Sequence, residues 1–341
     1  MDIPLSQNKA LIMKRFLSLF ILGAFCLAAL GQTKPSPSEV TVAKDGSGDY
    51  STIREAVNAL RSFRPEGRAT IFVKKGIYEE KVVVPSHKTD ISIIGEDRDS
   101  TILIWHDHAD MPDGKGGTIG TFETYTLKVD GPGFICENLT IINDALTYHS
   151  GKVGQAVALH IDADKVVIRN CGIKGFQDTV FTGDPEGREY FDNCWIEGTV
   201  DFIFGPATVW FRQCHLHAVA DGYYTAASTP EGHYGYIFDS CTFTAADGVS
   251  KLWLGRPWRP YAQVVLKDCL IDAPVDPEGW NDWGDPANHK TARFWEYSCS
   301  GKGADRSGRV RRSRKISNSR AQKIRLDKVF SRPAGKWESY R

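Results

Sequence analysis

Several common signatures are missing from the 341-residue sequence, and each absence excludes a class of protein. No C-x-x-C pair and no H-E-x-x-H motif occurs, which argues against a zinc site. No G-x-S-x-G motif occurs, which argues against the usual serine-esterase nucleophile. After residue 31 there is no apolar run long enough for a membrane-spanning helix. We therefore expect no metal, no other cofactor and no membrane association.

The N-terminus has the features of a secretory signal peptide. Lys14 and Arg15 precede an apolar run from Phe16 to Leu30, which is too short to span a bilayer. We predict a signal peptide over residues 1–31, with Met13 as an alternative start, a polar linker over 32–39 and a single domain over 40–341. The mature protein is expected to be secreted or periplasmic, and a monomer.

An excess of charge of one sign is also missing, because 42 Lys and Arg residues balance 42 Asp and Glu residues. The basic residues are unevenly placed, since the segment from Arg306 to Arg341 holds 13 of them against Asp327 and Glu338. A basic tail can bind nucleic acid. We favour a solvated cap at the end of the fold, because an exported protein rarely meets nucleic acid, and we expect no nucleic-acid partner.

A repeated pattern predicts the fold. Each copy has two apolar or aromatic residues, two polar residues, an apolar pivot, any residue, and another apolar residue. Six copies occur, at Ile135–Ile141, Val167–Ile173, Tyr190–Ile196, Trp210–Leu216, Ile237–Phe243 and Val265–Ile271. The pivots are Leu139, Cys171, Cys194, Cys214, Cys241 and Cys269. A short strand that recurs at intervals of this length predicts a solenoid whose turns stack on one another.

The cysteines fit this solenoid but leave their redox state open. Removal of Cys26 with the signal peptide leaves seven, an odd number that forbids complete internal pairing. Five of the seven are pivots at an apolar position, as expected for buried thiols. Neighbouring turns of a solenoid also bring cysteines within disulfide range, so buried thiols and one or two disulfides are both consistent with the sequence.

Two aspartates share one phase of the repeat. Asp178 and Asp201 each lie seven positions after a pivot cysteine, and their numbers differ by 23 (201 − 178). Since stacked strands lie about 4.8 Å apart, we predict that the two carboxylates are vertical neighbours. Gln155 precedes Asp178 by the same interval (178 − 155 = 23) and is predicted to continue the ladder. A ladder that only satisfies turn groups is the alternative, and Asp221, seven positions after Cys214, shows the same spacing.

The residue types around the pair point to acid–base and nucleophilic chemistry. Two carboxylates about 5 Å apart cannot both ionise freely, so one stays protonated while the other can attack. Arg256 can hold the anion, and the amides of Gln155 and Gln177 can donate hydrogen bonds to a developing oxyanion. Trp258 offers a flat apolar face of the type that packs on sugar rings.

The remaining sequence predicts caps and loops around the solenoid. Ile53, Ala56, Val57 and Leu60 have helical spacing, with Ser51 or Thr52 as the N-cap. Strand patterns occur at Thr70–Val73, Lys81–Val84, Ile91–Ile94 and Thr101–Ile104. Residues 106–120 read as a projecting loop, residues 274–303 as an aromatic loop, and the tail after Ser313 as weakly helical. The repeated turns are expected to end near Leu270, and no second domain is predicted.

Seven ordered motifs between Val40 and Val329 resemble the pectin methylesterase (pectinesterase) family, in its bacterial exported type. They are Val42-Ala-Lys-Asp-Gly-Ser-Gly-Asp-Tyr50, Gly76-x-Tyr78-x-Glu80, Gln155-Ala-Val-Ala-Leu159, Gln177-Asp-Thr179, Asp201-Phe-Ile-Phe-Gly205, Leu254-Gly-Arg-Pro-Trp258 and Gly279-Trp280-x-x-Trp283. The resemblance implies an all-β fold: a right-handed, single-stranded parallel β-helix with an N-terminal helical cap and a C-terminal tail of loop and helix.

The resemblance also implies an activity, the removal of methyl esters from homogalacturonan (pectin), and a role for each residue. Asp201 is implied as the nucleophile, Asp178 as the acid and then the base, and Gln155 and Gln177 as the oxyanion donors. Arg256, Trp258 and Phe202 are implied at the substrate site, with Arg256 orienting Asp201. Val180 and Phe181 stand where Leu and Tyr are more usual in the family.

Three other functions are compatible with a solenoid that carries paired carboxylates. A β-helix glycoside hydrolase such as a polygalacturonase also uses two carboxylates about 5 Å apart, but glutamine donors beside them would destabilise its oxocarbenium-like transition state. A pectate lyase would need calcium and a basic group. A non-catalytic polysaccharide-binding solenoid would not need the set of Gln, Asp and Arg residues.

Overall fold

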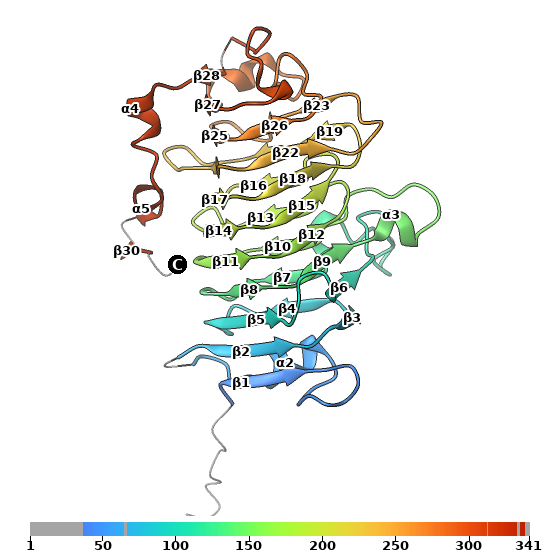
Figure 1. Cartoon of the computed structure of the whole chain (residues 1–341). Helices are drawn as coiled ribbons and strands as arrows, with labels where there is room; N and C mark the ends of the chain where they lie inside the picture. The colour runs from blue at the N-terminus through green and yellow to red at the C-terminus, as the bar shows by residue number, and fades with distance from the viewer. Residues whose placement is uncertain (1–36, 65–66, 312, 333–334, 338–341) are drawn as a thin grey trace, which may run out of the picture. The chain divides into compact units, whose positions relative to one another are not determined.

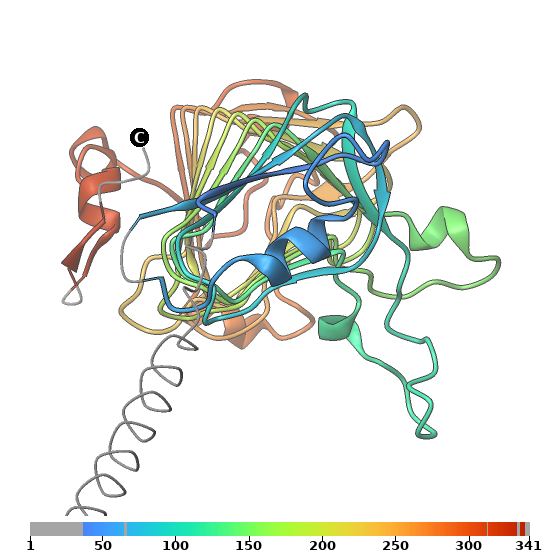
Figure 2. The ribbon, with the colours of Figure 1, turned by 90° about the horizontal axis from the view of Figure 1, so that it is seen from below.

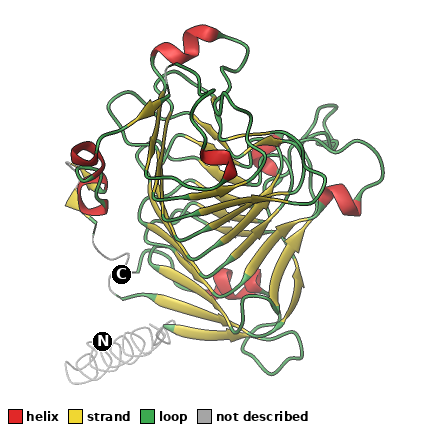
Figure 3. Cartoon of the chain, turned by 45° about the horizontal axis from the view of Figure 1, so that its top comes forward, coloured by secondary structure: helices red, strands yellow, loops and turns green. Residues whose placement is uncertain are grey.

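The computed structural model describes residues 37–64, 67–311, 313–332 and 335–337. The predicted signal peptide lies outside these residues, as does all of the predicted linker except residues 37–39. Short helices lie at the periphery of a body built of strands (Figure 3). They are α2 (Ile53–Ala59), α3 (Ala145–Tyr148), α4 (Asn318–Ala321) and α5 (Leu326–Val329), with 3-10 turns η1 (Thr121–Glu123), η2 (Pro286–Lys290) and η3 (Lys302–Ala304). In the described part of the chain, no helix has the length and apolar character needed to cross a membrane.

Three parallel sheets, here named A, B and C, form the walls of the body (Figure 1). Sheet A contains, in spatial order, β1 (Glu39–Val42), β2 (Ala69–Val73), β5 (Ile91–Gly95), β8 (Ile135–Glu137), β11 (Val166–Arg169), β14 (Arg188–Asp192), β17 (Thr208–Arg212), β21 (Tyr236–Asp239), β25 (Gln263–Lys267), β27 (Arg293–Tyr297) and β28 (Arg314–Lys315). Sheet B contains β3 (Gly76–Glu79), β6 (Thr101–Trp105), β9 (Thr140–Asn143), β12 (Gly172–Lys174), β15 (Trp195–Gly198), β18 (His215–Ala218), β22 (Thr242–Ala245) and β26 (Leu270–Asp272).

Sheet C contains β4 (Val82–Val84), β7 (Leu127–Val129), β10 (Leu159–Ile161), β13 (Val180–Thr182), β16 (Ile203–Gly205), β20 (Thr225–Ala227) and β24 (Arg256–Pro257). From β2 to β26 the chain visits sheets A, B and C in turn and then begins the next coil, so that each strand inside a sheet pairs with strands of the coils before and after it. Two small pairs complete the structure, β19 (Gly222–Tyr223) with β23 (Leu252–Trp253), and the antiparallel β29 (Ser331–Arg332) with β30 (Gly335–Lys336). This arrangement is a parallel β-helix and confirms the predicted fold class.

The repeated pattern proves to span a turn rather than a single strand. Each copy contains the end of a sheet A strand, a two-residue turn and the start of a sheet B strand. The residue before each pivot adopts a left-handed backbone, as in Asn170 (φ 48°) and Asn193 (φ 53°). Asparagine tolerates this conformation better than most residues do. The Asn170 amide donates to Asn138 Oδ1 at 2.8 Å, so a stacked Asn ladder exists at this turn, away from the two aspartates.

The pivots face the interior of the coils, where they belong to one continuous hydrophobic core. All five pivot cysteines are buried, and all seven cysteines of the described chain are free thiols. Cys171 and Cys136 lie in neighbouring coils with their Sγ atoms 3.8 Å apart. Of the two states that the sequence left open, the structure has the buried thiols.

Helix α2 covers the first coil and confirms the predicted cap. Thr52 Oγ1 accepts a hydrogen bond from Glu55 N at 3.2 Å, as an N-cap does. The carboxylate of Glu80 accepts bonds from Ile53 N and Arg54 N at 2.8 and 2.9 Å, and its negative charge faces the positive end of the helix. The Gly76–Glu80 motif therefore joins the cap to the coils.

The C-terminal end differs from the prediction in one respect. Residues 293–297, predicted as part of an aromatic loop, form β27 and extend sheet A beyond Leu270. An outer apolar row of sheet A, which includes Tyr190 and Trp210, is covered by the segment that contains α4 and α5. Arg188 ties this segment to the coils, because its Nη1 donates to Phe330 O at 3.0 Å while its Nε bonds Asp164 at 2.8 Å.

Two long loops project beside sheets B and C (Figure 2). One joins β6 to β7 and contains the predicted loop 106–120, and the other joins β9 to β10 and contains α3. The fully buried Asn143 ties them together, because its Nδ2 lies 3.0–3.1 Å from the carbonyl oxygens of Asp107, Thr124 and Val157. These loops reach the candidate site described next.

Candidate active site

Asp178 and Asp201 occupy equivalent places in consecutive coils. Each lies two positions before a strand of sheet C, and Val180 of β13 pairs with Ile203 of β16. Because 201 − 178 and 203 − 180 both equal 23, the two aspartates are vertical neighbours, as the spacing predicts. Both have left-handed backbones, with φ of 64° and 52°. Both side chains are largely buried, at 9% and 5% exposure.

Arg256 forms a bidentate ion pair with Asp201. Its Nε and Nη2 donate to the two carboxylate oxygens of Asp201 at 2.9 and 2.6 Å. The guanidinium carbon lies 4.0 Å from the ring centre of Tyr223 and 3.7 Å from that of Trp283. The cation is thus sandwiched between two aromatic rings, which restricts the direction from which it can hold Asp201.

The surroundings separate the protonation states of the two carboxyl groups. Burial, and then the charge of Asp201, raise the pKa of Asp178 well above its ordinary value, although Arg256 opposes the shift. Burial also raises the pKa of Asp201, but the hydrogen bond and charge of Arg256 act directly against it. Asp201 therefore deprotonates first, and Asp178 keeps its proton while Asp201 is an anion.

Gln177 and Gln155 reach the same cavity by different routes. Gln177 precedes Asp178, whereas Gln155 lies in the loop before β10, where Ala156 N donates to Gln177 O at 3.1 Å. Strand β10 pairs Leu159 with Val180, an offset of 21 (180 − 159), so Gln155 is not on the ladder as predicted. Neither side-chain amide bonds another protein group among the described residues, which leaves both free to donate to a ligand.

A cavity of about 380 Å³ brings these residues together on the outer face of sheet C. Its lining comprises Thr121, Phe122, Gln155, Gln177, Asp178, Asp201, Phe204, Ala226, Arg256, Trp258 and Trp283. The prediction that Phe202 contacts the substrate is wrong, because Phe202 is fully buried and packs on Tyr224 with ring centres 5.3 Å apart. Phe204 takes its place, since it faces outward and contacts Trp258.

Asp221, despite its spacing after Cys214, lies outside this cavity. Strand β16 pairs Ile203 with Thr225, an offset of 22 (225 − 203), so Tyr223 rather than Asp221 follows Asp201 on the ladder. The exposed Asp221 accepts bonds from Ser250 N and Lys251 N at 2.8 and 3.0 Å. It satisfies backbone groups at a turn, which is the structural role weighed for all three aspartates.

Sequence reasoning missed six contributors to the site. Besides Phe204 and its neighbour Ala226 in sheet C, Tyr223 and Trp283 stack on Arg256, and Thr121 and Phe122 come from the loop between β6 and β7. Trp283 belongs to the Gly279–Trp283 motif that the chain shares with the resembling family, but the motif does not indicate that Trp283 contacts Arg256. Thr121 and Phe122 belong to no repeat, and no pattern in the sequence places them near the aspartates.

The comparisons with known proteins agree with this geometry. The Pectinesterase family model matches residues 39–328. The chain belongs to the pectinesterase family. Pectinesterase 31 of Arabidopsis thaliana is 36% identical over 291 residues, which cover 83% of this chain and 89% of the relative. Other curated pectinesterases from the same plant are similar at 33–37% identity, so the bacterial subtype stays a prediction.

Solved pectin methylesterases share the fold of this pectinesterase. The enzyme from carrot has a TM-score of 0.75 and 32% identity, with 86% of this chain and 92% of that chain covered. A pectin methylesterase solved in complex with a hexasaccharide has a TM-score of 0.73 and 26% identity, with coverages of 85% and 96%. This chain is therefore an ester hydrolase of the pectinesterase class.

The buried acid of this pectinesterase should reduce the stability of the fold at neutral pH. The folded-state pKa of Asp178 exceeds the unfolded value of about 3.9. The protonated Asp178 therefore contributes its full share to the free energy of unfolding below about pH 3.9, and this share is lost as the pH rises through the folded-state pKa. Asp178→Asn should therefore raise Tm by roughly 2–4 °C per kcal/mol recovered at about pH 7, and by less near pH 4.

Calorimetry at the two pH values checks this expectation. Asp201→Asn is the matched control, because it leaves Arg256 without its carboxylate and should not raise Tm. Equal Tm gains for Asp178→Asn at both pH values would contradict the assignment of a raised pKa to Asp178.

Proposed function

We propose that the protein removes methyl esters from homogalacturonan, with Asp201 as nucleophile and Asp178 as acid and then base. One observation carries the proposal: Arg256 holds Asp201 in a bidentate ion pair, while the neighbouring Asp178 is buried and has a raised pKa. A nucleophile must be an anion and a leaving group needs a proton, and this environment favours one carboxyl group in each state.

In the first half-reaction, a carboxylate oxygen of Asp201 forms a bond to C6 of a methyl galacturonate unit. The carbonyl electrons move to its oxygen, which accepts hydrogen bonds from Gln155 and Gln177. When this oxyanion collapses, the bond from C6 to the methoxy oxygen breaks, and the departing oxygen takes the proton of Asp178. The products are methanol and an acyl group on Asp201.

In the second half-reaction, Asp178 is an anion and accepts a proton from water. The resulting hydroxide attacks C6 of the acyl-enzyme, and the bond to the Asp201 oxygen breaks. The galacturonic acid unit leaves and loses its proton to solvent, Asp201 is again a carboxylate, and Asp178 is again protonated. No step requires a cofactor.

Aromatic side chains beside the aspartates support a sugar substrate. Phe122, Phe204 and Trp258 line the cavity. The buried Phe181 supports this group from below, because its ring centre lies 4.8 Å from those of both Phe122 and Phe204. Aromatic faces in a cavity suit the apolar faces of pyranose rings. The hexasaccharide bound to a relative of the same fold supports a polymeric substrate.

Methanol release is the direct test. Highly methylated pectin should yield methanol and new carboxyl groups, without new reducing ends and without the unsaturated products that absorb ultraviolet light. Sensitivity to EDTA is not expected. New reducing ends would indicate a glycoside hydrolase, ultraviolet-absorbing products would indicate a lyase, and the absence of all products would indicate a binding protein.

Export and monomeric state complete the proposal. The signal-peptide pattern at residues 14–31 supports secretion or passage to the periplasm, where pectin is accessible. The cavity of the single chain already contains both carboxyl groups, both glutamines and the arginine, so a monomer suffices for the reaction.

A further inference from the structure

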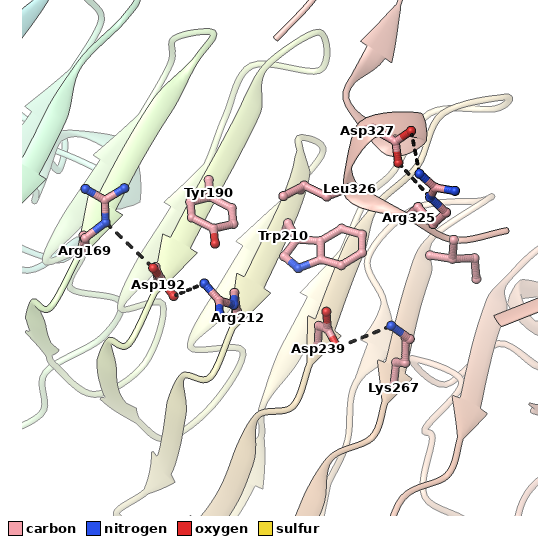
Figure 4. A pocket seen from close by; sticks show the side chains of 11 residues that line it. Arg169, Tyr190, Asp192, Trp210, Arg212, Asp239, Lys267, Arg325, Leu326 and Asp327 are labelled. Atoms are coloured by element: carbon pink, nitrogen blue, oxygen red, sulfur yellow. Dashed lines mark hydrogen bonds and ion pairs between the residues drawn. The ribbon is translucent and has the colours of Figure 1, made fainter. Parts of the chain in front are cut away.

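Two cavities flank the C-terminal segment where it crosses the outer face of sheet A, away from the catalytic cavity on sheet C. The first, of about 730 Å³, lies beside α5 and has Tyr190 and Trp210 in its lining (Figure 4). The second, of about 640 Å³, lies beside α4. Its lining comprises Gly232, His233, Tyr234, Gln263, Arg293, Trp295, Ser317, Ser319, Arg320, Lys323 and Ile324. Both are larger than the catalytic cavity, so size alone does not identify their roles.

Each charged residue that lines the first cavity has a partner of opposite charge. Asp192 lies 3.8 Å from both Arg169 and Arg212, and Lys267 lies 3.5 Å from Asp239. Arg325 pairs with Asp327 at 3.0 Å on the facing α5 segment, and the dashed lines in Figure 4 mark these pairs. A charged ligand would have to compete with partners that are already in place.

In the part of the chain that the structure describes, the second cavity is instead lined by cations without carboxylate partners. Arg293, Arg320 and Lys323 line it, no Asp or Glu residue does, and none of the three cations has a carboxylate partner within the described chain. Among the residues that the structure describes, the only acidic partner of a lining residue is Glu186, which pairs with His233 at 3.0 Å. Burial without an adjacent carboxylate lowers the pKa of Arg293. A bound anion would reverse this unfavourable environment.

Two of these cations are held in place before any ligand arrives. Arg293 donates from Nε and Nη2 to Tyr261 O at 3.3 and 2.9 Å. The guanidinium carbon of Arg320 lies 4.2 Å from the ring centre of Trp295. Pre-positioned guanidinium groups lose little entropy when they bind a carboxylate. The hydroxyls of Ser317 and Ser319 and the ring of Tyr234 add polar and aromatic contacts of the kind that sugars use.

We propose that this cavity is a second binding site, selective for de-esterified homogalacturonan. The proposal rests on the proposed function, because each turnover then creates a carboxylate and turns the product into a polyanion. In the catalytic cavity, Asp201 neutralises Arg256, so that site favours the neutral ester. The second cavity has uncompensated positive charge and would retain the polymer by the groups already converted.

Binding of defined oligosaccharides to the full chain tests the second site. In an Asp178→Asn background, which removes the proton donor but keeps the Asp201–Arg256 ion pair, Arg320→Gln/Lys323→Gln should weaken binding of a de-esterified oligogalacturonate about tenfold. Binding of the fully methylated oligomer should not change. With Asp178 and Asp201 both intact, the double variant should release methanol from a short esterified substrate at the normal rate. Added salt should reduce the difference between the variants.

Arg314→Gln/Lys315→Gln is the matched control, because it removes two exposed charges from the same segment outside the cavity. An equal loss of affinity in this control would overturn the site and leave only diffuse electrostatic attraction. If the double variant also bound a sulfated polysaccharide about tenfold more weakly, selectivity for uronates would be overturned. Selective binding without methanol release from the unmodified protein would refute the proposed function, whereas methanol release with unchanged binding in the double variant would refute the second site alone.

Discussion

Asp201→Asn should lower methanol release from methylated pectin by at least about 10³-fold. The amide has the size of the carboxylate but no anionic oxygen with which to attack C6. It can still accept one hydrogen bond from Arg256, which now donates two to Asp201. Protein purified in parallel should keep a cooperative thermal transition, so that the loss reports on chemistry rather than on folding. Initial rates of methanol release and calorimetry on the same preparation measure both quantities.

Asp221→Asn is the control for this experiment, because Asp221 shares the spacing from a pivot cysteine but is exposed at a turn. It should keep normal activity, with at most a small loss of stability from weaker bonds to Ser250 and Lys251. Asp201→Asn activity above a few per cent of wild type would contradict the nucleophile assignment. Loss of the thermal transition in that variant would instead show that Asp201 is structural.

Equal spacing predicted the aspartate pair because, in two consecutive coils, the chain takes the same number of residues from the pivot cysteine to the start of the sheet C strand. The offset between β13 and β16 (203 − 180 = 23) equals the spacing of the cysteine pivots Cys171 and Cys194 (194 − 171 = 23). The coils on either side have smaller offsets, 180 − 159 = 21 and 225 − 203 = 22. Counting back 23 residues from Asp178 therefore placed Gln155 on the ladder wrongly, because the offset there is 21. Counting seven residues from Cys214 selected Asp221, although Tyr223 is the residue that follows Asp201 on the ladder. A repeat with variable loops gives reliable neighbours only where loop lengths match.

The direction of a side chain at the end of a strand was also beyond the sequence pattern. Phe202 and Phe204 are equally aromatic and lie in one motif, yet Phe202 enters the core while Phe204 faces the cavity. Strict alternation would place both on the same face, but Phe202 precedes β16 and faces the core together with Ile203, so the alternation begins only at Ile203. Trp283 reaches Arg256 from a loop with its own positive φ of 62°, a contact that depends on tertiary structure alone.

Gln177→Ala should lower kcat by roughly 10²–10³-fold, the usual cost of one oxyanion donor. KM should change little, because the hydrogen bond strengthens only as charge develops on the carbonyl oxygen. The Gln177 amide has no protein partner in the described structure, so its removal should leave Tm nearly unchanged. The backbone bond from Ala156 N to Gln177 O does not involve the side chain and should persist.

Asn170→Ala provides the opposite pattern in the same assay. Its amide belongs to the Asn ladder at the turn between sheets A and B, and its backbone is left-handed, so alanine should lower Tm and leave kcat intact. Measuring Tm and kcat for both variants separates a donor that acts on the reaction from an amide that only supports the fold. A Gln177→Ala enzyme that is destabilised yet fully active would show that the Gln177 amide only supports the fold. Gln155 would then be the sole side-chain candidate for holding the oxyanion.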